Sequence, residues 1–64
     1  MTLEKAIELL KIQIDLGSGY NRNSAKLILA EVQRTHGQAA VNDLINKLDL
    51  ERHFGFKVGE RITV

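Results

Sequence analysis

The first 16 residues follow the hydrophobic period of an α-helix. Apolar residues at positions 3, 7, 10 and 14 recur at intervals of four, three and four, so they share one helical face. Thr2 can cap the first turn, and we predict a helix over about 2–16. Leu9, Ile12 and Leu16 form a second apolar strip beside that face. One neighbouring helix would not cover both, so we expect this helix to be central or to contact two partners.

Two more helices are predicted in the middle of the chain. Apolar residues between positions 25 and 32 predict a helix over about 23–36, and those at 41, 44, 45 and 48 predict another over about 38–50. Gly37 follows the first of these directly and can adopt the positive φ that often ends a helix. Because Gly37 is almost the whole connection, the two helices should meet at a sharp corner or a short antiparallel turn.

The C-terminal tail, 54–64, reads FGFKVGERITV and has a period of two. Apolar residues occupy positions 54, 56, 58, 62 and 64, which is typical of an extended strand or of a hairpin turning at Gly59 and Glu60. A lone strand needs a partner for its free edge, and a second copy could supply one across a two-fold axis. Alternatively, the tail lies along the helices, and its phenylalanines close the core.

The length limits how stable such a fold can be alone. A domain of 64 residues buries only about 60% of the surface that its unfolded chain exposes, so small folds usually need a disulfide, a metal or a partner chain. The absence of cysteine excludes disulfides and thiolate zinc sites. We therefore predict an all-α fold for 1–64: a single three-helix small domain with a short extended C-terminal tail, forming a homodimeric helical bundle. The expected interface and core residues are Leu3, Ile7, Leu10, Ile14, Phe54, Phe56 and Val58.

Charge and targeting signals narrow the classes of function. Nine basic and eight acidic residues give a formal net charge of +1, without the positive excess typical of nucleic-acid binders. The N-terminal segment carries Glu4 and Glu8 and does not resemble a signal peptide, and no apolar run is long enough to span a membrane. We expect a soluble cytoplasmic protein that does not bind membranes, which also fits the absence of cysteine.

Residues 17–24 read GSGYNRNS and could be mistaken for a phosphate-binding loop. A Walker-type loop needs a lysine followed by serine or threonine, and the dinucleotide fingerprint needs a glycine where this chain has Arg22. Both fingerprints therefore fail. A turn between helices is the preferred interpretation, with a weak anion site at Arg22, Ser24 and Lys26 as the alternative.

An amide stripe raises the possibility of DNA binding. Gln38, Asn42 and Asn46 are four residues apart on the third predicted helix, and amide side chains can pair with adenine edges. Against this, the same helix carries Asp43 and Asp49, and its one-residue turn is shorter than that of a helix-turn-helix. A solvated polar face is the simpler interpretation.

The two histidines, His36 and His53, could serve as metal ligands or as a general base. Two histidines are too few for a metal shell without carboxylates, and no nucleophile or acid constellation stands out around them. We expect no enzyme activity, no cofactor and no metal. The predicted function is a small protein–protein interaction or adaptor module acting as a homodimer, with a possible protein partner. The alternative is a small DNA-binding or nucleic-acid-associated regulator.

Overall fold

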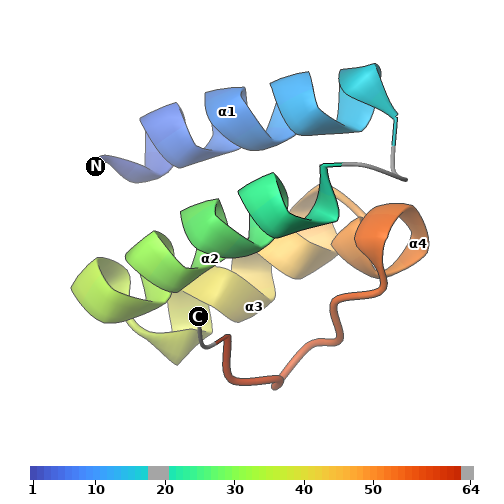
Figure 1. Ribbon diagram of the computed structural model, residues 1–64. Helices are drawn as coiled ribbons and strands as arrows, with labels where there is room; N and C mark the ends of the chain where they lie inside the picture. Colours follow the sequence, from blue (N-terminus) through green and yellow to red (C-terminus); the bar gives the residue numbers. More distant parts are fainter. Residues whose placement is uncertain (18–20, 63–64) are drawn as a thin grey trace.

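The computed structural model describes residues 1–17 and 21–62, and these residues form an all-α fold (Figure 1). Its helices are α1 (Leu3–Leu16), α2 (Arg22–His36), α3 (Gln38–Lys47) and α4 (Leu50–Phe54). Helices α1, α2 and α3 run successively antiparallel, and the short α4 lies at one end (Figure 1). After α4, the tail runs back beneath α2 and α3 (Figure 1).

Helix α1 begins as predicted. Thr2 is its N-cap, and the Thr2 hydroxyl oxygen accepts a hydrogen bond from the Lys5 amide at 3.1 Å. Of the two alternatives for α1, the central position is wrong, because α1 lies at the edge of the molecule and packs mainly on α2 (Figure 1). Contact with a second partner stays a prediction. Ala6 and Leu10 are its fully buried residues. The face that α1 buries against α2 is therefore narrower than the seam at positions 3, 7, 10 and 14 that the sequence predicted.

The third predicted helix, 38–50, is interrupted in the structure. Asp49 has φ 55° and ψ 45°, a left-handed conformation that a continuous α-helix does not contain. Helix α3 therefore ends at Lys47, and α4 begins at Leu50. The described residues form four helices instead of the predicted three, because the turn at Leu48 and the left-handed Asp49 separates α3 from α4.

The tail lies along the helices, which was the third of the alternatives for it. Phe54 belongs to α4, and no strand occurs in 1–17 or 21–62. The tail turns at Val58 and Gly59, where the Glu60 amide donates to the Lys57 carbonyl oxygen at 3.0 Å. Phe56 and Ile62 on either side of this turn are buried, so the period of two reflects contact with the helices rather than strand pairing.

One apolar core joins all four helices and the tail. Its fully or almost fully buried residues are Ala6, Leu10, Ala25, Leu29, Val32, Val41, Leu44, Ile45, Leu50, Phe54, Phe56 and Ile62. Of the residues predicted for core or interface, Leu10, Phe54 and Phe56 belong to this set, and Ile7 and Ile14 pack against it while partly exposed. Leu3 and Val58 are instead 38% and 47% exposed. A single copy of the chain thus closes its own core.

Candidate interaction surface

The three residues of the predicted anion site do not share one face of α2. The Arg22 Nε donates to the Phe54 carbonyl oxygen at 2.8 Å, and its guanidinium carbon lies 4.5 Å from the centre of the Phe56 ring. Lys26 is on the same face of α2 as Arg22, since residues four apart share a face, whereas Ser24 is rotated about 200° from each of them. The structure therefore does not bring Arg22, Ser24 and Lys26 together, and Arg22 holds the tail. Residues 18–20 of the predicted turn lie outside the described part of the chain.

Amide side chains of α2 and α3 hold the tail in place. The Gly59 amide donates to Asn42 Oδ1 at 2.8 Å, and Gln38 Nε2 donates to the Glu60 carbonyl oxygen at 2.9 Å. The Ile62 amide donates to Gln33 Oε1 at 2.7 Å. Two of the three residues in the amide stripe are therefore engaged in fixing the backbone of the tail.

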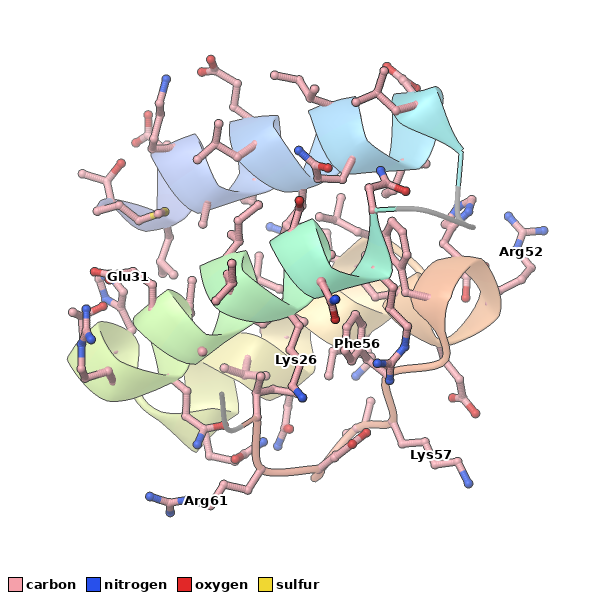
Figure 2. All side chains as sticks on the ribbon, in the orientation of Figure 1. Lys26, Glu31, Arg52, Phe56, Lys57 and Arg61 are labelled. Carbon is pink, nitrogen blue, oxygen red and sulfur yellow. The ribbon has the colours of Figure 1, made fainter. Side chains whose placement is uncertain are left out.

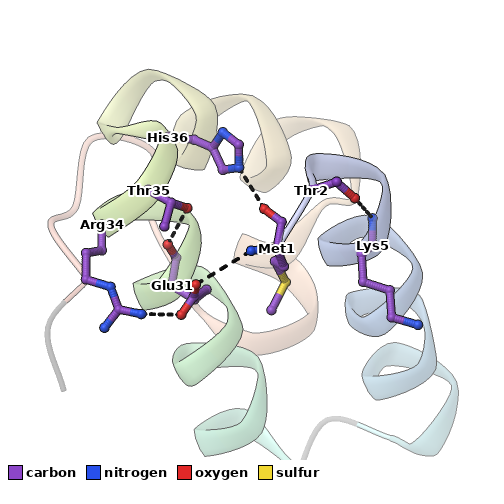
Figure 3. Close-up of polar contacts among 7 residues, drawn as sticks. All are labelled: Met1, Thr2, Lys5, Glu31, Arg34, Thr35 and His36. Carbon is purple, nitrogen blue, oxygen red and sulfur yellow. Dashed lines mark hydrogen bonds and ion pairs between the residues drawn. The ribbon is translucent and has the colours of Figure 1, made fainter.

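The start of the chain is fixed in the same way to the end of α2 (Figure 3). The Met1 amino group is 3.7 Å from Glu31 Oε2, and Glu31 also pairs with Arg34. His36 Nε2 donates to the Met1 carbonyl oxygen across 2.9 Å. His36 thus has a structural contact.

The other histidine also has a structural environment. His53 is half-buried beside Phe54, with ring centroids 6.4 Å apart. Over 1–17 and 21–62, no three residues of the histidine, cysteine, aspartate or glutamate types come close enough to hold a metal ion.

An open hollow of about 680 Å³ lies between α2 and the end of the tail. Leu27, Ala30 and Ile62 are its apolar residues. Its charged residues are Arg34, Arg61 and Glu31, and Glu31 pairs with Arg34. Figure 2 shows Arg61 and Lys57 projecting outward from the tail below α2. The hollow's described lining includes neither a histidine nor a serine or threonine, so it offers no nucleophile and base pair.

An exposed apolar ridge follows the outer side of α1. We define the α1 ridge as Leu9, Ile12 and Leu16, of which Leu9 is half-buried, Ile12 is 46% exposed and Leu16 is 73% exposed. The ridge is rotated more than about 90° from the buried Leu10, so contact with α2 does not cover it. The sequence predicted this second strip, and the helix that carries it lies at the edge of the molecule (Figure 1).

The α1 ridge has the spacing of a helix-packing seam. Its residues are separated by three and then four positions, and Lys5 extends the seam by four toward the N-terminus. This is the alternation that lets one helix pack along another. The other large apolar side chains that are exposed in the described residues are scattered: Met1 and Leu3 lie at the start of α1, Leu27 on α2 and Val58 in the tail. Single exposed apolar residues of that kind are ordinary on a folded surface.

A scan against protein-family models finds no match, and searches of curated proteins and of solved structures find none either. None of the helices in the described residues is both long enough and apolar enough to cross a membrane. The function must therefore be inferred from the chain's own surface.

Proposed function

We propose that this chain is a small non-enzymatic protein–protein interaction or adaptor module that acts as a homodimer through the α1 ridge. The observation that carries the proposal is a heptad-spaced apolar face left open on a domain that has already closed its core. The ridge is available for contact with a second chain because folding leaves Ile12 and Leu16 exposed and Leu9 only half-buried. The absence of cysteine favours a cytoplasmic setting for such a module.

A homodimer could be intertwined or side by side, and the closed core favours the side-by-side form. Phe54, Phe56 and Ile62 complete the core from within the same chain, so no exchange of the tail is required to bury them. Dissociation should therefore separate folded monomers. Helical structure should not depend on protein concentration.

The size of the ridge indicates a weak and reversible association. Three apolar side chains on a helix of 14 residues make a contact well below the roughly 800 Å² per partner of a standard interface. We expect a dissociation constant of about 0.1–1 mM, equivalent to about 4–5.5 kcal/mol. An association of this strength can give way to a protein partner that binds the same ridge more tightly.

Mass in solution tests this proposal when measured by light scattering over a hundredfold dilution from about 2 mM. The wild type should change from dimer to monomer while its circular dichroism stays helical. Ile12→Asp should be monomeric throughout, because it places a carboxylate at the centre of the ridge.

Leu27→Asp is the matched control, since Leu27 is 54% exposed but belongs to α2, and it should dimerise like the wild type. A wild type that is monomeric at every concentration would refute the homodimer. Equal dimerisation of Ile12→Asp and wild type would show that the α1 ridge is the wrong surface.

Hydrogen bonding within the chain makes the nucleic-acid alternative less attractive. Base reading by the amide stripe would require Gln38 and Asn42 to release Glu60 and Gly59. Each release would leave polar backbone groups of the tail without their partners. This cost supports the interaction module over the DNA-binding regulator.

A further inference from the structure

We infer that two copies pair antiparallel along the α1 ridge, so that Lys5 of each copy meets Asp15 of the other. The inference rests on the proposed homodimer and adds its orientation and register. It starts from the charged residues at the two ends of the ridge. Lys5 continues the seam at its N-terminal end, and Asp15 lies beside Leu16 at its C-terminal end.

The register follows from the spacing of the ridge. An antiparallel pair centred between Leu9 and Ile12 places Leu9 of one copy opposite Ile12 of the other, twice by symmetry. Lys5 lies 5.5 residues before this centre and Leu16 lies 5.5 residues after it, so they are opposite each other. Asp15 lies 4.5 residues after the centre, which is an axial offset of only about 1.5 Å from the partner's Lys5.

This register also covers the most exposed residue of the ridge. Leu16 is 73% exposed in the single chain. The aliphatic stem of the opposite Lys5 can lie over it while the ammonium reaches the adjacent Asp15. One side chain thereby supplies both apolar cover and charge pairing.

Lys5 is able to make this contact. Its side chain is 54% exposed, and its ion pair with Glu8 at 3.3 Å is on the surface. Surface pairs of this kind are weak, so Lys5 can turn toward a second carboxylate. Glu8 lies on the same flank, so in the dimer each Lys5 ammonium would lie between its own Glu8 and the partner's Asp15.

A parallel pair would lose this complementarity. Residues of equal number would then be opposite each other, so Lys5 would meet a second Lys5 within the seam. Like charges at facing positions of a helix pair disfavour that arrangement. The antiparallel pair is therefore the one that the charges select.

Charge reversal tests the contact between Lys5 and Asp15. Lys5→Glu and Asp15→Lys should each weaken the dimer about tenfold in low salt, and the two together should recover most of the loss. The tenfold difference in dissociation constant between each single variant and the wild type should become smaller at about 0.5 M salt, where exposed charges are screened. If the double variant dimerises as weakly as the single variants while its helical structure is intact, the pairing of Lys5 with Asp15 is wrong.

Spin-label distances test the orientation independently of stability. The chain has no cysteine, so Glu4→Cys provides a single exposed labelling site on α1. An antiparallel pair separates the two labels by about 20 Å along the helix axis, because each lies 6.5 residues from the centre. A parallel pair places them at the same height.

The two tests separate the orientation from the proposed function. Labels at equal height in a dimer that Ile12→Asp abolishes would overturn only the antiparallel inference. An absence of any dimer would overturn the homodimer itself.

Discussion

Gly37→Ala isolates the cost of one backbone conformation. Gly37 is the single residue between α2 and α3, and its backbone has φ 96° and ψ 173°. That combination is essentially restricted to glycine and costs a residue with a side chain about 1–3 kcal/mol. A Cβ built at Gly37 meets nothing within 4 Å, so the expected cost comes from the backbone and not from a clash with neighbours.

The net effect is smaller than the strain because alanine also restricts the unfolded chain. That restriction favours folding by about 0.4–1 kcal/mol, which leaves a net loss of roughly 1–2 kcal/mol. A domain of 64 residues has about 3–10 kcal/mol of stability in total. The melting temperature should fall by about 5–15 °C.

Urea unfolding followed by circular dichroism measures this loss, and asparagine substitutions supply the control. Gly55 has φ 82° and ψ 15°, a left-handed conformation that asparagine adopts readily. Gly37→Asn should therefore destabilise the fold clearly more than Gly55→Asn. A Gly37→Ala variant within about 0.3 kcal/mol of wild type, or a reversed order of the two asparagine variants, would refute the conformational argument.

Two further predictions concern the attachment of the tail. Phe56→Ala should lower the unfolding free energy by about 3–5 kcal/mol, a large share of the total, because Phe56 is only 1% exposed. Val58→Ala should change the unfolding free energy by less than about 0.5 kcal/mol, because Val58 is 47% exposed. Similar losses in the two urea titrations would mean that the tail is not held by Phe56. Arg22→Lys should lose about 1–2 kcal/mol with its charge retained, since lysine offers neither the planar stack on Phe56 nor the Nε donor to Phe54. Unchanged stability and unchanged amide exchange in the tail would contradict that role.

Local patterns were sufficient to predict most of the helical structure. The apolar repeat in the first segment and the Thr2 cap identified α1, and Gly37 marked the junction between α2 and α3. These features depend on neighbours within a few positions, so the sequence contains them directly. The same repeat also showed that α1 has two apolar strips. It did not show which strip faces the core, because that depends on how the other helices are arranged.

Local patterns did not predict the break at Asp49 or the contact between the Asn42 side chain and the tail. Asp49 lies among residues that continue the helical repeat, yet its backbone is left-handed and is followed by α4, whose Leu50 and Phe54 are buried. Aspartate tolerates this conformation better than most residues, but it does not require it. Asn42 and Gly59 are 17 positions apart, and nothing local predicts that one holds the other.

The contact between Arg22 and Phe54 spans a still longer separation. These residues are 32 positions apart, and the sequence near Arg22 predicts only a weak anion site at its own helix start. A cation beside a helix start is a common anion-binding signal. Here the partner is a carbonyl oxygen at the end of α4, which only the folded arrangement of α2 and α4 brings near.

Long-range hydrogen bonds within the chain take the place of the disulfide, metal or partner chain that a domain of this size usually needs. Arg22, Gln33 and Asn42 each bind a backbone group of α4 or the tail, and His36 binds the carbonyl of Met1. These bonds join segments 17–35 positions apart, as a disulfide or metal would in other small folds. The core of a single copy is thus buried without a partner chain, which changes what an exposed apolar surface means. Because the core is closed without the α1 ridge, covering that ridge can be reversible, and association can vary with concentration while the fold does not.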